Sequence, residues 1–493
     1  MEIENRKIRY RLPVRIVDFK GDIENVETLL KEKDTQIYLV EYDVLKVKGE
    51  GYIILDFGEE IAGGIRILSN LGFNQAGKLM KLRLRFGESV AETCSEIGEK
   101  GATNDHALRD FYINIPHLSD ECYGDTGFRF VRIDFYADSE AYHPIKSIYS
   151  REWFYDYKPV KQFKSDDKLL NKIYDTCLHT VTLCMQGRIW DGIKRDRLVW
   201  IGDMEPEIHA ILHAYGDIEV IEKTIETAKL SNPMPNWINS IPSYSAWFLL
   251  IIYDIYKYKN DPKYVLKHLD YLNEIIKTFD RSLDENGNLD FMWSKDIYFL
   301  AMPYFIDWPT YREDNEKERI DANVLLLQYV FPKVLEMYEK SGQDTSIINH
   351  ILAKLAKSDV SIPSTKVFAA FYQLVHKDDE SYKVLIKDGV KGMSTFMSYY
   401  LLKAVAQKDK NKAVEMLKEY YGAMLSKGAT SFWEDFNIEW LDGSSRIDEL
   451  PKEGEKDLHG DFGGYCYVGY RHSLCHGWSS GPISFLFEEY NKK

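Results

Sequence analysis

Residues 190–207 concentrate ionisable and indole side chains more densely than a plain helix face does. A charge run of this kind is most often a solvated, salt-bridged loop, and that interpretation stays open at this point. An exposed loop, however, has no need of two large apolar rings, so the tryptophans favour a functional site. The stretch holds five carboxylates, three cations and two tryptophans: Asp191, Asp196, Asp203, Glu205, Glu207, Lys194, Arg195, Arg197, Trp190 and Trp200.

Paired carboxylates are what the hydrolysis of a glycosidic bond requires. One carboxylic acid protonates the leaving oxygen, and a second carboxylate activates water or attacks the sugar. Asp196 is the candidate acid, but Arg195 and Arg197 flank it. Because facing cations lower the pKa of a carboxyl group, they oppose that role. Asp196 can serve as an acid only if both guanidinium groups turn away from it or are neutralised.

The elements that must position these residues change in kind along the chain. Up to about residue 155, apolar segments lie between Gly, Asn and Asp breaks, which predicts strands and suggests a β-sandwich. From Ser165 onward the apolar spacing becomes helical, and a helix is expected to begin at Asp261-Pro262. Periodicity alone leaves a closed helical barrel and an irregular bundle as alternatives. The predicted strands are 36–42, 51–57, 64–68, 79–86 and 127–135.

Composition excludes several classes of function. The formal net charge of −15 repels phosphate backbones, so no nucleic-acid partner is expected. The amino terminus lacks a signal-peptide pattern and no stretch has the length of a membrane span, so we expect a cytoplasmic chain without a membrane partner. Six scattered cysteines without a Cys-x-x-Cys pair indicate neither disulfides nor zinc, and no metal or cofactor is expected. The oligomeric state is left open.

The segment from Trp190 to Asp203 resembles the signature of glycoside hydrolase family 78, the α-L-rhamnosidases. The resemblance extends along nearly the whole chain, in the family's order, and implies a jelly-roll-like β-sandwich in residues 1–157 followed by an (α/α)6 barrel in residues 158–493. The family's usual carboxy-terminal β-sandwich is missing, which implies a short form. The other similar segments are 54–59, 85–88, 126–132, 305–308, 428–434 and 473–478.

The resemblance also implies roles for individual side chains. Asp196 would be the general acid and Glu434 the general base of an inverting exo-glycosidase that removes terminal α-L-rhamnosyl residues from oligosaccharides or glycosides. Inversion requires the two carboxyl groups to stand roughly 6.5 to 9.5 Å apart, whereas about 5 Å would indicate retention. The predicted substrate contacts are Asp191, Arg195 and Asp203 for the hydroxyl groups, Trp200, Trp308, Trp433 and Trp478 for the methyl group, and Asp307 and His476.

Two positions depart from the family pattern. Asp196 stands where many relatives carry Glu, so the shorter side chain must approach the sugar more closely. Ser243 stands where the family would place an acidic residue. Two alternatives therefore remain: another inverting glycosidase or uronyl-processing enzyme on the same helical barrel, or a sugar-binding relative without catalysis.

Overall fold

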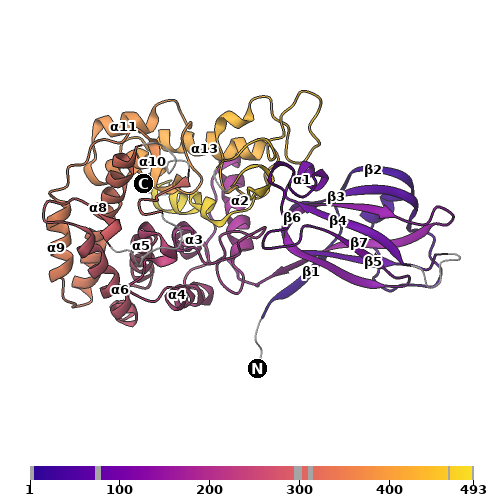
Figure 1. Cartoon of the computed structure of the whole chain (residues 1–493), viewed down its shortest axis with the longest axis horizontal. Coiled ribbons are helices and arrows are strands. Elements are labelled where there is room, and N and C mark those ends of the chain that lie inside the picture. Colours follow the sequence, from indigo (N-terminus) through magenta and orange to yellow (C-terminus); the bar gives the residue numbers. More distant parts are fainter. Residues whose placement is uncertain (1–4, 73–78, 294–301, 309–314, 465–466, 491–493) are drawn as a thin grey trace.

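The computed structural model describes residues 5–72, 79–293, 302–308, 315–464 and 467–490. Within these ranges the chain forms a β part and a helical part, which lie at opposite ends of the molecule in Figure 1. Each part has a hydrophobic core of its own, and the two large cores share no residue. None of the helices described is long and apolar enough to cross a bilayer.

The β part is a seven-stranded sheet in which β2 pairs with β3 outside the main strand order, β1-β7-β3-β6-β4-β5. Its centre is β3, which pairs with β2 and β6 in antiparallel fashion and changes register between Asp56 and Ile61. Buried residues of β3, β4, β6 and β7 build the core. The strands are β1 (Lys7–Arg11), β2 (Arg15–Glu24), β3 (Leu45–Ser69), β4 (Met80–Gly87), β5 (Asp110–Ile115), β6 (Asp120–Tyr136) and β7 (His143–Phe154).

Two strand predictions differ from the structure. The segments 51–57 and 64–68 are parts of one long strand, β3, and not two strands. The strand predicted at 36–42 is wrong, because these residues form no strand. Most of their apolar side chains lie exposed, with Leu39 at 70% and Tyr42 at 86%, because no neighbouring strand covers them.

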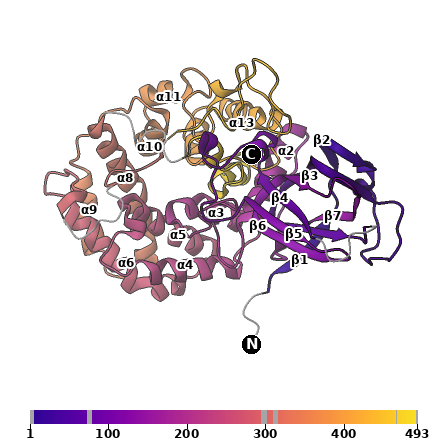
Figure 2. The same cartoon turned by 45° about the vertical axis from the view of Figure 1, so that its right-hand side comes forward.

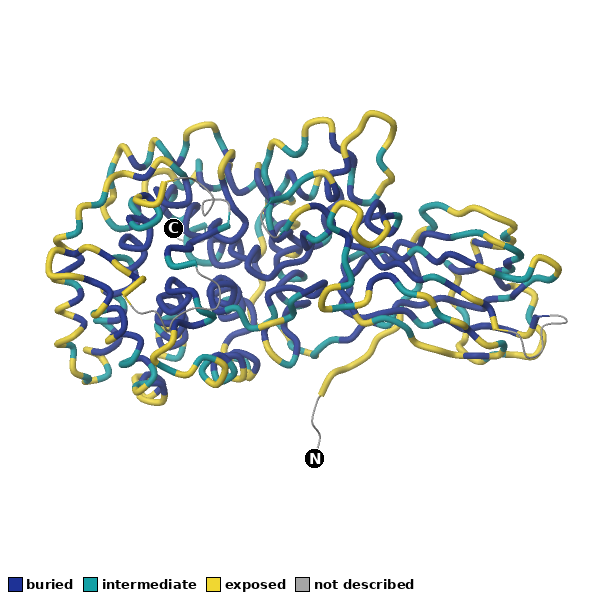
Figure 3. Tube along the Cα trace, in the orientation of Figure 1, coloured by how far each residue is buried: buried dark blue, intermediate teal, exposed yellow. Residues whose placement is uncertain are grey.

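The helices of the helical part differ in how completely they are buried. Every residue of α3 except His213 is buried, and α5 is apolar nearly all round, as expected of inner helices. In contrast, α6 begins at Pro262 behind the Asp261 cap, as predicted, and keeps one face exposed. Figure 2 shows α3 and α5 toward the middle with α4, α6 and α9 toward the rim, and Figure 3 shows the same division by burial.

The helices that the structure describes have the following bounds: α1 (Val90–Cys94), α2 (Lys168–Cys184), α3 (Ile201–Ala214), α4 (Glu219–Ser231), α5 (Pro242–Lys259), α6 (Pro262–Ser282), α8 (Glu316–Lys340), α9 (Ser346–Leu355), α10 (Lys366–His376), α11 (Asp379–Ile386), α12 (Ser398–Ala406), α13 (Lys410–Ser426) and α14 (Pro482–Phe485). The first, α1, belongs to the β part and lies at its junction with the helical part (Figure 1). All the others follow β7.

Candidate active site

The loop between α2 and α3 carries Asp191, Arg195 and Asp196. It is closed on itself, because the Asp191 N–H donates to Leu198 O and the Leu198 N–H donates to Asp191 Oδ1 at 2.8 Å. Asp196 and Arg197 adopt left-handed backbone angles, φ 53° and 55°, which Asp tolerates better than most residues. This turn brings the Asp196 side chain to the cavity that the loop borders.

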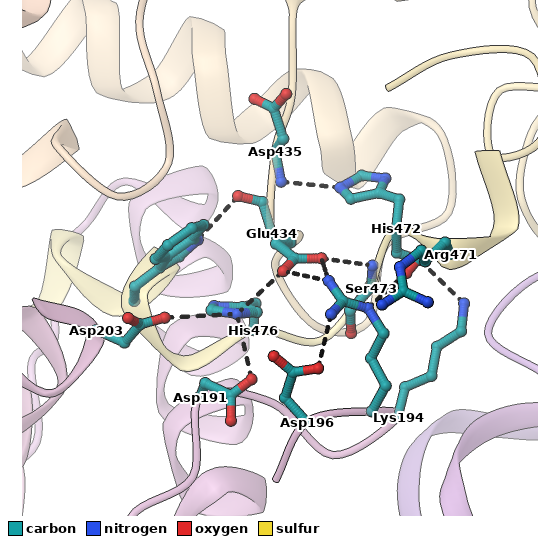
Figure 4. Close-up of polar contacts among 12 residues, drawn as sticks. Asp191, Lys194, Asp196, Asp203, Glu434, Asp435, Arg471, His472, Ser473 and His476 are labelled. Atoms are coloured by element: carbon teal, nitrogen blue, oxygen red, sulfur yellow. Dashed lines mark hydrogen bonds and ion pairs between the residues drawn. The ribbon is translucent and has the colours of Figure 1, made fainter. Parts of the chain in front are cut away.

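Glu434 lies on the irregular segment that follows α13 and faces this loop. Its carboxylate accepts hydrogen bonds from Arg195 Nη2, at 2.8 and 3.0 Å, and from the Ser473 N–H at 3.0 Å. Figure 4 shows the carboxyl groups of Glu434 and Asp196 one above the other. Through Nη1, Arg195 also donates to Asp196 Oδ1 at 2.9 Å. One side chain thus connects the two carboxylates that the sequence paired.

The two arginines that flank Asp196 behave differently. Arg197 turns away, since its Nη2 donates to the backbone oxygens of His106 and Asp125 in the β part. Arg195 does not turn away, but its charge is shared with the buried Glu434. The sequence required both guanidinium groups to turn away from Asp196 or to be neutralised. Arg197 turns away, and the charge of Arg195 is balanced by Glu434.

The Arg195 bridge limits the separation of the two carboxylates. Because the two contacts leave from adjacent nitrogens of one planar guanidinium group, the linked oxygens of Asp196 and Glu434 stand at most roughly 8 Å apart. Asp196 lines the cavity, whereas Glu434 is 2% exposed and lies behind Arg195 and His476. Burial raises the pKa of Glu434, while Arg195 and the Ser473 N–H act in the opposite direction.

Two further acids surround the ring of His476. Its Nε2 lies 3.4 Å from Glu434 Oε1, 3.7 Å from Asp203 Oδ1 and 3.9 Å from Asp191 Oδ2 (Figure 4). Burial raises the pKa of Asp203 and, together with Asp203 itself, the pKa of Asp191. Burial also lowers the pKa of His476. These groups are therefore biased toward neutral forms that can both donate and accept hydrogen bonds, as sugar hydroxyls require.

The cavity has a volume of about 290 Å³, close to the lower end of the range for small-molecule sites. Trp200 and Trp308 line it, but Trp433 and Trp478 do not. Trp478 instead donates from Nε1 to Glu434 O at 2.8 Å. The lining consists of His106, Asp191, Arg195, Asp196, Trp200, Asp203, Ile241, Tyr244, Met302, Phe305, Trp308, Tyr467, Arg471 and His476.

Two predicted positions lie beside the cavity. Asp307 is buried next to Trp308, and burial raises its pKa to about 7. Ser243 is buried at the start of α5, and its hydroxyl has no hydrogen-bond partner among the residues described. The neighbouring Tyr244 lines the cavity and donates to Asp203 Oδ2 at 3.1 Å, so α5 does contribute a polar group there.

Several residues at the site carried no clear signal in the sequence. Tyr467 lies under the guanidinium group of Arg195, at 4.7 Å from the ring centroid. His106 comes from the β part, and its Nδ1 lies 2.9 Å from Asp196 Oδ1. Neither contact could be inferred, because each joins segments far apart in the chain.

The β part also contacts the site through Glu88. Its carboxylate accepts hydrogen bonds from the Ser473 hydroxyl and the Leu474 N–H, and lies 3.3 Å from Lys194 Nζ. Lys194 is in turn 2.8 Å from Glu92. Burial raises the pKa of Glu88 to about 7, against the opposing effect of Lys194. Glu88 thus contacts both the loop of Asp196 and the segment that holds Glu434.

The helical fold and the carboxylates beside a cavity of this size are features that a six-hairpin glycosidase domain would have. Residues 158–345 match the family model for the bacterial α-L-rhamnosidase six-hairpin glycosidase domain. Within residues 158–345 this match confirms the resemblance to the α-L-rhamnosidases found in the sequence. No curated protein matches the chain by sequence.

Solved rhamnosidases share the fold at low sequence identity. The rhamnosidase from Klebsiella oxytoca, a structure with rhamnose bound, is 16% identical over 98% of this chain and 96% of its own, with a TM-score of 0.74. The rhamnosidase of Bacillus sp. GL1 is 18% identical over 94% and 48%, with a TM-score of 0.68. The α-L-rhamnosidase of Streptomyces avermitilis, complexed with L-rhamnose, is 13% identical over 98% and 44%, with a TM-score of 0.67. The chain spans about half the length of the last two.

Proposed function

We propose that this chain is an inverting exo-glycosidase that removes terminal α-L-rhamnosyl units, with Asp196 as general acid and Glu434 as general base. The observation that carries the proposal is the Arg195 bridge between these two carboxylates at the cavity. The bridge holds the linked oxygens of Asp196 and Glu434 at most roughly 8 Å apart, which accommodates the separation of an inverting pair with one water between the two carboxylates.

In the proposed mechanism the two carboxylates act on opposite sides of the sugar. Asp196 lines the cavity and donates its proton to the leaving oxygen. Glu434 accepts a proton from the attacking water, and Arg195 and the Ser473 N–H stabilise its ionised form. For the water to reach Glu434, the Arg195 and His476 side chains that cover it must admit the water between the two carboxylates.

The substrate contacts follow from the cavity lining. Asp191, Asp203 and His476 bind the ring hydroxyls as neutral donors and acceptors, and Arg195 adds charge-assisted hydrogen bonds. Ile241, Phe305 and Trp308 offer the apolar surface that a 6-deoxy sugar needs. We assign Trp478 to positioning Glu434, because it donates to the backbone of that residue.

The finer architecture belongs to the same proposal. We infer that the helices close into an (α/α)6 barrel over residues 158–493 and that the sheet of residues 1–157 forms a jelly-roll-like sandwich. The ends of β7 at Phe154 and of the linker before α2 at Lys168 support this division. A cytoplasmic location stays a prediction, which fractionation of cells that express the protein would test.

Hydrolysis of an aryl α-L-rhamnoside, with the first-formed anomer followed by NMR, tests the proposal. We expect the anomer opposite to that of the substrate, and a loss of about 100-fold or more in turnover for Asp196→Asn and for Glu434→Gln. Retention, or near-normal turnover by either variant, contradicts the assigned mechanism. A panel of other aryl glycosides separates a different sugar specificity, and binding of L-rhamnose without turnover of any rhamnoside would indicate a silent sugar-binding relative.

A further inference from the structure

We infer that His106, which the β part contributes to the cavity, is the positioning residue of the general acid. This inference rests on the proposed acid role of Asp196. His106 lies on the connection between Gly101 and β5, lines the same cavity, and has a 40% exposed side chain. The imidazole of His106, from the β part, thus lies directly against Asp196, from the helical part.

The contact is made through a single ring nitrogen. His106 Nδ1 accepts a hydrogen bond from the Asp196 backbone N–H at 2.6 Å and lies 2.9 Å from Asp196 Oδ1. A nitrogen that accepts from the N–H carries no proton itself, so its one lone pair is directed at the Asp196 backbone. The contact therefore holds the backbone from which the Asp196 side chain projects into the cavity. Fixing that position is what a proposed general acid requires at the leaving oxygen.

The backbone at Asp196 explains why such a support is needed. Asp196 and Arg197 both lie in the left-handed region, with φ of 53° and 55°, a conformation that costs free energy for residues other than Gly. An acceptor for the Asp196 N–H stabilises this turn and fixes the direction of the side chain. Because Asp is one carbon shorter than Glu, a small rotation of the turn would remove its carboxyl group from the leaving oxygen.

The surroundings of His106 hold it in place from several sides. Its backbone oxygen accepts from Arg197 Nη2 at 3.1 Å, and the adjacent Asp105 forms an ion pair with Arg471. Arg195 is a further charged group at the His106–Asp196 contact, since its Nη1 donates to the same Asp196 Oδ1. The contact thus belongs to a network that spans both domains.

Leaving-group dependence distinguishes a positioning role from a merely structural one. An acid matters most when the leaving group is a poor one, so His106→Ala should cost about 10-fold or more in kcat/KM on alkyl and unactivated aryl α-L-rhamnosides. On a dinitrophenyl rhamnoside, which needs little protonation, the loss should be less than about 3-fold. His106→Asn should recover much of the loss, because its amide oxygen can accept from the Asp196 N–H. His350→Ala, at a similarly exposed histidine of the helical part, is the control and should behave as the wild type.

The same series of substrates with Asp196→Asn separates the role of His106 from that of Asp196. If Asp196→Asn shows no leaving-group dependence, the proposed acid role fails. If Asp196→Asn shows it but His106→Ala loses activity equally on all substrates, the role of His106 is overturned and that of Asp196 stands.

A second measurement does not require activity. Hydrogen exchange of the Asp196 amide should be faster in His106→Ala than in the wild type, and slower again in His106→Asn. Unchanged exchange in His106→Ala would overturn the inference whatever the substrate of the enzyme is.

Discussion

Arg195 and Glu434 form a buried ion pair in which the guanidinium Nη2 lies 2.8 and 3.0 Å from the two carboxylate oxygens. Because the same guanidinium also reaches Asp196, the charge of the candidate base and the position of the candidate acid depend on one side chain. The backbone oxygen of Arg471 accepts from its Nε at 2.8 Å and the ring of Tyr467 lies beneath it, which leaves this side chain little freedom to move.

Arg195→Lys should therefore be a severe change despite the retained charge. A lysine ammonium is a single point charge and cannot span both carboxylates in fixed directions. We expect kcat/KM on an aryl rhamnoside to fall by about 100-fold or more. Arg188→Lys, at an exposed arginine that binds Thr227, is the matched control and should retain activity. Similar activity in both variants would contradict a bridging role for Arg195.

Glu88 should stabilise the fold through its contacts between the β part and the helical part. Glu88→Ala leaves Lys194, the Ser473 hydroxyl and the Leu474 N–H without this acceptor, so the free energy of unfolding should fall by about 2–4 kcal/mol. Glu88→Gln, which resembles the protonated side chain, should cost less than about 1 kcal/mol. Urea unfolding measures both, with the exposed Glu96→Ala as control. Equal effects of the Ala and Gln variants would contradict this account.

Tyr244→Phe should weaken sugar binding without disturbing the fold. The Tyr244 hydroxyl donates to Asp203 Oδ2, and loss of one such bond costs about 1 kcal/mol, or roughly 5-fold in the Kd for L-rhamnose. Calorimetric titration with L-rhamnose measures the change. Tyr253→Phe, whose hydroxyl binds Glu336 away from the cavity, should leave the Kd unchanged. An unaltered Kd in Tyr244→Phe would contradict the proposed contact between Asp203 and the sugar.

His209 should make the free energy of unfolding fall as the pH rises above neutrality. Burial lowers its pKa, but Asp254 and Glu488 outweigh this and raise the pKa to about 9, from 6.5 as a free side chain. Because the folded state binds the proton more tightly, this contribution is complete below pH 6.5 and is lost as the pH rises through 9. The stability difference between wild type and His209→Gln should therefore shrink, by on the order of 1–3 kcal/mol, between pH 6.5 and 9. Urea unfolding across this range checks it, with the partly exposed His376→Gln as a flat control.

The fold was largely predictable because buried residues recur in the sequence at the spacing of the strand or helix that contains them. The change from strand to helix spacing, the Asp261 cap and most of the strands agree with the structure. The prediction at 36–42 is wrong because alternation also occurs in exposed segments, where a partner strand is what decides. Whether a tryptophan lines a cavity was likewise not predictable, since Trp433 lies on an irregular segment with no period to orient it.

The site was predictable only where its residues lie in recognisable segments. Asp196 and Glu434 were found through the order of these segments along the chain. His106 and Glu88 were not assigned a role, because their partners lie about 90 and 385 residues away and the contacts exist only where the β part meets the helical part. No local pattern encodes contacts between segments so far apart in the chain.

The contacts between the β part and the helical part offer a way for heat to inactivate the protein before it unfolds. His106 lies in the β part and Asp196 in the helical part, and they meet at His106 Nδ1. A slight loosening between the two parts would misalign the proposed acid while both hydrophobic cores stay intact. On a warming ramp, turnover of poor leaving groups should therefore decline first, turnover of activated substrates next, and the cooperative melting of the cores should come last.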